Sequence, residues 1–252
     1  IEKAFLNMPV EVRDASVEEI KSKLKARRTN LGLISDRYYS LVNKFAVIKG
    51  TDKDDWYDVE RLPNGKTKVT AYRIKNDQKT DKFHERIYSC YDTKEIWIYG
   101  LDDDDVFHVF GKGDREIKIR LVGGQNNDTY NIEEGKRVIF YDYKSKKNTV
   151  LTNKGHKKFT DSYKTNVYDY SKLKNSTNQI IPTFGINPDD GFKIGVLNTY
   201  TLFSFERYHF TAKDSVVSSY YFATNGYDVN YSGELDILFQ GVNFLLNLIF
   251  IS

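Results

Sequence analysis

The residues best suited to chemistry in this sequence are the carboxylates and amides of two consecutive turns. The first turn holds four successive acids, Asp102–Asp105, and the second is the run Gly123-Gly124-Gln125-Asn126-Asn127-Asp128. Calcium takes about 6–8 oxygen ligands, which Asp carboxylates and the carbonyls of a tight glycine-rich turn can supply. The candidate calcium ligands are therefore Asp103, Asp105, Asn126 and Asp128. The alternative is that these side chains form Asx-turns and only shape the backbone.

Both turns lie between strands of similar pattern. The second turn, with Thr129 and Tyr130, resembles the glycine–aspartate nonapeptide of calcium-binding β-rolls, and the first turn is a degenerate copy of it. Apolar strands are expected at Glu95–Tyr99 and Glu116–Val122. Each is followed, after its turn, by a shorter strand, Val106–Phe110 or Thr129–Ile132.

These strands recur with a fixed period. Ile96, Ile117 and Val138 follow one another at equal intervals along the sequence. A period of roughly 20 residues predicts a short β-solenoid or β-roll, in which Asp105 stacks near Asp128. The third unit has Asn148 in place of the Asp, as suits a capping coil.

The sequence holds no recognisable catalytic motif. The 4 His residues are scattered, and neither HExxH, GxSxG nor a P-loop occurs. The single cysteine, Cys90, excludes an internal disulfide and is expected to be a strand residue rather than a nucleophile. On this evidence the segment is a scaffold.

Composition favours β-structure. The 252 residues allow one large domain or two small ones, and a net charge of +3 gives no general attraction to nucleic acid. The 19 Tyr and 16 Phe suit strands, and they also suit the aromatic girdles of outer-membrane barrels.

The N-terminal segment, residues 1–50, is expected to be helical. The run Ser16-Val17-Glu18-Glu19 predicts a capping box, and Ile20, Leu24, Leu31, Ile34, Tyr38, Leu41 and Phe45 form one apolar face, with the helix running to about Asn43. Basic residues lie mostly off this face. They predict a solvated helix packed on a sheet, or alternatively a face that meets phosphate or anionic lipid.

The remaining chain divides into three further segments. Residues 51–152 are expected to form a β-meander and the β-solenoid, with a turn at Pro63-Asn64-Gly65, a polar loop at Lys75–Lys82 and a strand at Phe83–Tyr91. Residues 153–180 read as a linker. Residues 181–252 alternate over about 12–20 residues per strand, which predicts the first strands of a truncated outer-membrane β-barrel; the soluble alternative is a β-sandwich.

Together these patterns predict a mainly β fold. An N-terminal amphipathic helix, a β-meander and a short β-solenoid or β-roll are followed by long antiparallel strands of an incomplete outer-membrane β-barrel.

Several runs resemble a known family. The run RRTNLGLISDRYYSLVNKFAVIKG and the runs HERIYSCYDTKEIWIYGLDDDDVFHVFG and IKIRLVGGQNNDTYNI resemble the region after the catalytic domain in large calcineurin-like metallophosphoesterases of Bacteroidota. The run FGINPDDGFKIG, from Phe184, is similar to the start of their C-terminal barrel, which is of the bacterial surface-antigen type and is related to outer-membrane assembly factors.

This resemblance implies a role without assigning a catalytic residue. The phosphoesterase motifs DxH, GDxxD, GNH[DE] and GHxH are absent, so a two-metal centre is expected only in a domain upstream of Ile1, and most barrel strands are expected beyond Ser252. The chain would be the non-catalytic connector and membrane anchor of an outer-membrane metallophosphoesterase in a Gram-negative bacterium. Its β domain would be periplasmic or surface-exposed.

The implied partner is outer-membrane lipid, with no nucleic acid. Two alternatives stay open: an extracellular calcium-dependent β-roll binding module, and a barrel component for outer-membrane protein assembly or translocation.

Overall fold

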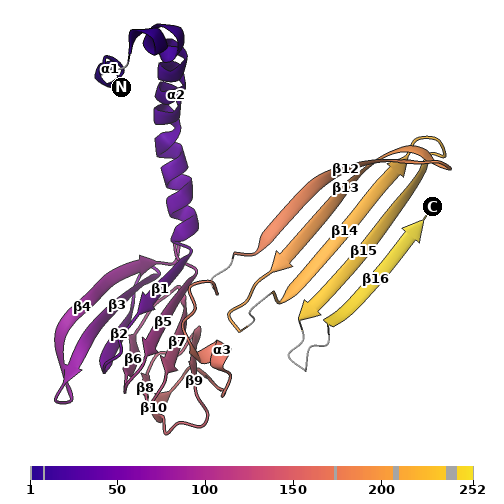
Figure 1. Ribbon diagram of the computed structural model, residues 1–252. Helices are drawn as coiled ribbons and strands as arrows, with labels where there is room; N and C mark the ends of the chain where they lie inside the picture. Colours follow the sequence, from indigo (N-terminus) through magenta and orange to yellow (C-terminus); the bar gives the residue numbers. More distant parts are fainter. Residues whose placement is uncertain (1, 8, 173–174, 207–209, 237–242, 252) are drawn as a thin grey trace. The chain divides into compact units, whose positions relative to one another are not determined.

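The chain folds into two compact units, residues 1–161 and residues 162–252 (Figure 1). The computed structural model describes residues 2–7, 9–172, 175–206, 210–236 and 243–251. The observed fold is mainly β with an N-terminal helix, as the sequence predicts. None of the helices within these ranges is long and apolar enough to cross a membrane.

The first unit begins with two helices, α1 (Glu2–Phe5) and α2 (Val10–Val42). The helix end near Asn43 is confirmed, but the expected start at Ser16 is wrong, because Ser16 lies inside α2. Pro9 stands directly before the first helical residue with extended φ and ψ of -52° and 141°. The fixed φ of proline suits a helix start, and residues 10–15 contain neither Gly nor Pro, so the helix can continue through the capping-box residues.

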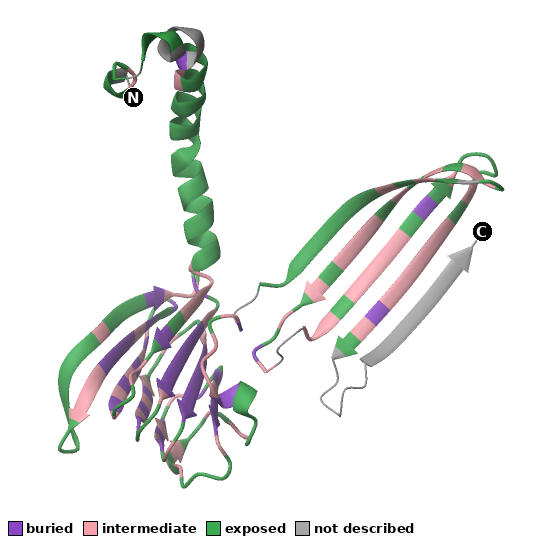
Figure 2. Cartoon of the chain, viewed as in Figure 1, coloured by how far each residue is buried: buried purple, intermediate pink, exposed green. Residues whose placement is uncertain are grey.

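α2 projects from the sheets rather than packing along one (Figure 2). Every residue from 22 to 42 is exposed. The prediction of a helix packed on a sheet is therefore wrong for this stretch, although its apolar stripe is present.

Eleven strands follow in the first unit. Their bounds are β1 Phe45–Lys49, β2 Asp55–Leu62, β3 Lys66–Lys75, β4 Gln78–Ser89, β5 Glu95–Leu101, β6 Val106–Gly111, β7 Lys118–Gly124, β8 Thr129–Ile132, β9 Val138–Asp142, β10 Thr149–Asn153 and β11 His156–Phe159. They form two sheets. Sheet A has the order β1-β5-β7-β9-β11, and sheet B has the order β10-β8-β6-β2-β3-β4.

The chain crosses repeatedly from sheet A to sheet B. Each crossing makes a layer of two strands: β1 with β2, β5 with β6, β7 with β8, and β9 with β10. Neighbouring layers pair in parallel in both sheets. The layers are thus stacked, with the same turn recurring at one edge.

The layers are not evenly spaced in sequence. Ile96 pairs with Ile119 and not with Ile117, and Ile119 in turn pairs with Val138. The even register expected through Ile117 is therefore wrong by two positions, because the layers differ in loop length. The first interval is longer than expected and the second is shorter by the same amount, so the two errors cancel between Ile96 and Val138.

A hairpin interrupts the stack after β2. β3 and β4 pair in antiparallel order with β2 at the edge of sheet B, which confirms the meander and its Asn64-Gly65 turn. The expected loop at Lys75–Lys82 is mostly strand. Asn76 and Asp77 make the turn alone, with φ of 51° and 59°, a conformation that Asn and Asp tolerate.

The core of this unit lies between the two sheets. Tyr57, Phe107 and Tyr130 stack from sheet B, with ring centroids 5.0 and 5.2 Å apart. Ile98 and Leu121 of sheet A belong to the same buried cluster. Each such side chain contributes about 1.5–3 kcal/mol through burial.

The second unit is a single antiparallel sheet, sheet C, preceded by the short helix α3 (Tyr163–Asn166). Its strands in order are β12 Thr177–Asn187, β13 Gly191–Leu202, β14 Ala212–Tyr221, β15 Gly226–Asp236 and β16 Asn243–Ile251. Among the described residues β12 and β16 each have one neighbour, so the sheet is open. Long antiparallel strands are confirmed.

Two expectations for this part change. The strands hold 9 to 12 residues and are shorter than the longest expected from the sequence. The segment expected to be a linker, 153–180, contains β11, α3 and the start of β12. Its polar composition concealed β11, which is a four-residue edge strand of sheet A, paired with β9.

Candidate functional site: a buried aspartate ladder

The turns that link sheet A to sheet B hold a ladder of buried carboxylates. The Asp55 amide donates to Asp105 Oδ1, and the Asp105 amide donates to Asp128 Oδ1, each at 2.8 Å. The Asp128 amide donates in the same way to Asn148 Oδ1, also at 2.8 Å. Each side chain thus satisfies a backbone donor of the layer before it, so the four layers are joined by a continuous chain of hydrogen bonds.

The second oxygen of each aspartate points into the turn. Asp105 Oδ2 and Asp128 Oδ2 are buried and accept no hydrogen bond within the described residues. Both lie against glycines: a Cβ added to Gly100 would overlap Asp105 Oδ2, and one added to Gly123 would overlap Asp128 Oδ2. A glycine at these positions is therefore required by the carboxylate beside it.

Burial holds two of the ladder carboxyls in their neutral form. Desolvation, together with the charge of Asp128, raises the pKa of Asp105 to about 10. Desolvation and the neighbouring Asp142 likewise raise the pKa of Asp128. Desolvation also raises the pKa of Asp55, although its Oδ1 has an ion pair of 2.9 Å with Arg73. A buried carboxylate without a cation is costly, so Asp105 and Asp128 keep their protons when folded.

The last layer departs from the others. Asp142 follows Tyr141, the strand partner of Val122, and its Oδ2 lies close to Gly123. This oxygen accepts a hydrogen bond of 2.8 Å from the Tyr130 hydroxyl. Asn148, which replaces the ladder aspartate, also donates from Nδ2 to the Tyr143 carbonyl at 3.1 Å. The capping layer thus ends the ladder with an uncharged amide.

The four candidate calcium ligands fall into two separate pairs. Asp105 and Asp128 are adjacent, which confirms the predicted stacking, but both are buried and bonded to backbone amides. Asp103 and Asn126 lie outside at the exposed turn, where the Asn126 amide nitrogen donates to Asp103 Oδ1 at 3.4 Å. Within the described residues, no three His, Cys, Asp or Glu side chains come together as a metal site would require.

Sequence reasoning missed the first rung of the ladder. The first layer has the same residue spacing as the second and the third. The three equivalent sets are Gly50, Asp55, Tyr57 and Val59; Gly100, Asp105, Phe107 and Val109; and Gly123, Asp128, Tyr130 and Ile132. Asp55 could have been found from this shared pattern. Each copy has a Gly, an Asp five positions later, an aromatic residue two positions after the Asp, and an aliphatic residue two positions after the aromatic residue. The hairpin β3–β4 lies between the first two copies in the sequence and conceals the period.

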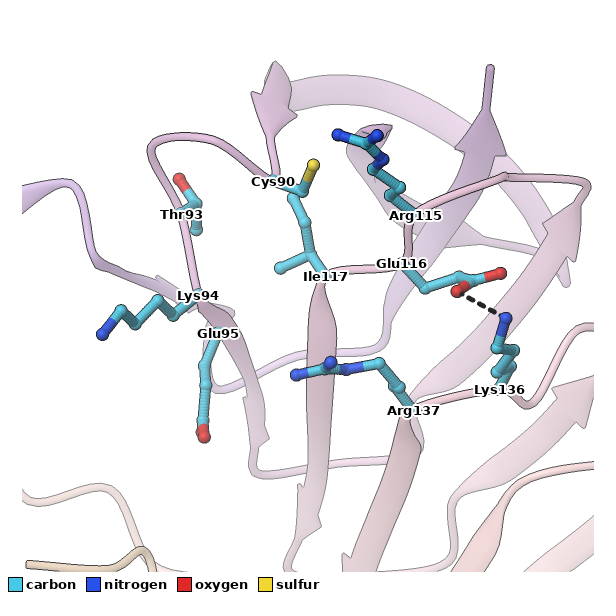
Figure 3. A pocket seen from close by; sticks show the side chains of 9 residues that line it. All are labelled: Cys90, Thr93, Lys94, Glu95, Arg115, Glu116, Ile117, Lys136 and Arg137. Atoms are coloured by element: carbon cyan, nitrogen blue, oxygen red, sulfur yellow. Dashed lines mark ion pairs between the residues drawn. The ribbon is translucent and has the colours of Figure 1, made fainter. Parts of the chain in front are cut away.

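A second feature lies at the opposite ends of the sheet A strands. A hollow of about 570 Å³ is formed where the chain enters β5, β7 and β9 (Figure 3). Its lining residues are Cys90, Thr93, Lys94, Glu95, Arg115, Glu116, Ile117, Lys136 and Arg137.

The acids of this hollow are already paired. Glu116 binds Lys136 at 3.1 Å, and Glu95 binds the Arg120 Nε at 2.8 Å. No lining residue is a histidine, so Cys90 has no imidazole base there. Cys90 also packs against Gly65 and the core in the turn after β4, which suits a structural role.

Comparison with protein-family models, with curated proteins and with solved structures finds no match to this chain.

Proposed function

We propose that this chain is the non-catalytic connector and membrane-anchoring part of an outer-membrane metallophosphoesterase. In this proposal sheet C is part of a barrel wall, and the stacked layers form a short β-solenoid that acts as a rigid spacer. The resemblance of the sequence supplies the enzyme class, and the two faces of sheet C supply the strongest structural support.

One face of sheet C is apolar and exposed. Its cross-strand rows include Phe184, Ile194, Tyr220 and Tyr227, and next to them Pro182, Val196, Ser218 and Val229. Phe184 is 66% exposed and Val196 is 44% exposed. Exposed apolar surface on this scale marks a contact with lipid or protein.

The other face of the same strands is mostly polar. In β13 it holds Lys193, Gly195, Thr199 and Thr201, and these side chains are less exposed than Ile194 and Val196. One apolar row, Ile181, Leu197 and Val217, crosses this face. Strands of about 9–11 residues with apolar and polar sides in alternation are typical of a transmembrane barrel wall. The strands of 9 to 12 residues in sheet C fit this length.

Two polar side chains on the apolar face are satisfied there. Asn198 donates to Asn178 Oδ1 at 2.7 Å, and Asp214 accepts from the Tyr231 hydroxyl at 2.7 Å. Each bond lowers the cost of placing a polar group against lipid.

Liposome flotation tests the membrane role. The full chain should float with phospholipid vesicles, and Val196→Arg should reduce the floated fraction because a charge at the lipid face costs about 2–4 kcal/mol near the bilayer centre. Thr199→Arg, on the polar face of the same strand, is the matched control and should float as the original chain does. Equal loss in both variants would argue against a lipid-facing side.

A separate assay tests the non-catalytic role. The chain should show no turnover of a generic phosphodiester with Mn²⁺ present, because the metal-binding motifs are absent from it. Turnover that survives purification of the chain would overturn this part of the proposal.

A further inference from the structure

α2 carries a heptad pattern with one charged residue in it. Eight residues follow one another at alternating intervals of three and four, the a and d spacing of a coiled coil. We call them the α2 seam: Val17, Ile20, Leu24, Arg27, Leu31, Ile34, Tyr38 and Leu41. All but Arg27 are apolar or aromatic.

The seam is exposed along most of its length. Leu31 is 61% exposed, Ile34 is 56% exposed and Tyr38 is 69% exposed. A helix gains most of its stability by packing such a face, so an uncovered seam marks a docking surface. A strict seven-residue repeat favours another helix as the occupant, because it keeps the seam facing a supercoiled partner.

The charges beside the seam have one sign. The e and g positions between Ile20 and Leu41 hold Lys21, Lys23, Arg28, Asn30, Ser35 and Arg37, with no acid among them. Lys21 and Lys23 pair with Glu18 and Glu19, on the side away from the seam. Arg27, Arg28 and Arg37 have no ion-pair partner among the described residues.

A second copy of this chain would fit the seam poorly. In a parallel pair, Lys23 would face Arg28 of the other copy, and Arg27 would meet Arg27. In an antiparallel pair the flanking charges would again all be positive. Like charges at these positions disfavour association, whereas opposite charges select the partner.

We propose that α2 docks a partner helix whose own heptad seam is flanked by Glu or Asp, forming a two-stranded coiled coil. Arg27 reaches from the seam to an acid of the partner, and Lys23, Arg28 and Arg37 pair with acids at its e and g positions. The docking surface lies within residues 17–41 and is independent of the membrane role of sheet C.

Fluorescence anisotropy with two synthetic peptides tests this. Both have four heptads with Ile at a and Leu at d; one has Glu at every e and g position and the other has Lys. The full chain, kept in one mild detergent throughout, should bind the Glu peptide at least about tenfold more tightly than the Lys peptide, because several facing pairs change from attraction to repulsion. High salt should reduce the difference in affinity between the two peptides. Equal binding, or no binding of the Glu peptide, would overturn the proposal.

Three variants locate the contact. Leu31→Ser combined with Ile34→Ser should abolish binding of the Glu peptide, whereas Leu33→Ser, an equally exposed leucine outside the seam, should leave it unchanged. Lys23→Glu combined with Arg28→Glu leaves two positive and two negative residues beside the seam. This variant should bind the Lys peptide more tightly than the original chain does and should lose most of the preference for the Glu peptide, and a helix that merely unfolds cannot gain binding in this way. Dimerisation of the original chain that is lost in the seam variant would overturn the proposal in favour of a second copy.

Discussion

Gly123 and Asp128 show how closely the ladder residues fit. A Cβ on Gly123 would overlap Asp128 Oδ2 and the Tyr130 hydroxyl, and would lie 2.6 Å from Asp142 Oδ2. Gly123→Ala should therefore lower the unfolding free energy by about 1–3 kcal/mol or more, since the buried neighbours must shift.

Thermal melts of the full chain check this expectation. The matched control is Gly32→Ala, because a Cβ there meets nothing within 4 Å and alanine favours the helix by up to about 1 kcal/mol. If Gly123→Ala has the same melting temperature as the original chain, the turn is looser than the ladder requires.

The ladder should also make stability depend on pH. The folded pKa of Asp105 is about 10, whereas an unfolded aspartate titrates near ~3.9, so the contribution of Asp105 is fully present below about pH 4 and is lost as pH rises toward the folded pKa. Asp105→Asn removes this titration. An amide is compatible with the ladder position, as Asn148 shows.

Melting temperatures between pH 5 and pH 9 measure the effect. Relative to the original chain, Asp105→Asn should become more stable as the pH rises, while the exposed Asp92→Asn should follow the original curve throughout. Parallel curves for Asp105→Asn and the original chain would contradict a protonated Asp105.

Calcium is expected to leave the fold unchanged. The Oδ1 atoms of Asp105 and Asp128 already accept backbone amides, so an ion would have to displace the bonds that join the layers. Millimolar calcium should therefore not raise the melting temperature, which a ligand of the native state would do. A rise that chelator reverses, and that Asp128→Asn removes, would restore the calcium-module alternative.

At this scale the sequence predicted which acids stack but not what they do. The proximity of Asp105 and Asp128 followed from the repeat, because parallel stacking places equivalent turns together. Their inward orientation depends on Gly100 and Gly123, which leave room for the carboxylates. The place of Asp55 in the ladder was not predicted, because the inserted hairpin β3–β4 breaks the period between Asp55 and Asp105.

Among the elements, Arg61 of β2 connects the layers at the edge opposite the ladder. Its buried guanidinium donates to the Ile117 carbonyl at 2.8 Å, to the Lys136 carbonyl at 3.1 Å and to Thr67 Oγ1 at 3.2 Å. Desolvation lowers the pKa of Arg61 to about 10, so it stays charged at neutral pH. It thus ties β2 to the chain entering β7 and β9.

Replacing Arg61 should loosen the stack. Arg61→Met leaves the Ile117 and Lys136 carbonyls without this donor and should lower the free energy of unfolding, measured in urea, by about 2 kcal/mol. Arg86→Met, which removes an exposed arginine bonded to Asn43, should change stability by no more than about 0.5 kcal/mol. Similar midpoints for the two variants would argue against a linking role for Arg61.

Element boundaries were predictable where local signals agree with packing. Alternation and turn residues were enough to predict the strands on both sides of each acidic turn and the Asn64-Gly65 hairpin. The start of α2 was not predictable, because Ser16 and Glu19 form a good capping pattern although the helix already begins at Val10 and runs through them. The uneven spacing of the layers could not be predicted from the sequence either, because a change in loop length shifts the strand register without changing the apolar pattern.

For the whole molecule, the mainly β fold and the long antiparallel strands followed from the change in apolar period along the chain. The role in the outer membrane is a proposal that depends on the two faces of sheet C. Alternation alone cannot tell whether lipid or another sheet covers the apolar face, because both surroundings select the same side chains.

Site-directed spin labelling can show which face of sheet C meets lipid. In a Cys90→Ser background, single labels at Val196 and Thr199 would report on the two faces of β13 in phospholipid vesicles. If sheet C lies in the bilayer, the label at 196 should be accessible to oxygen and shielded from a water-soluble nickel chelate, with the opposite result at 199. Equal chelate access at both positions would show that sheet C is not in the bilayer.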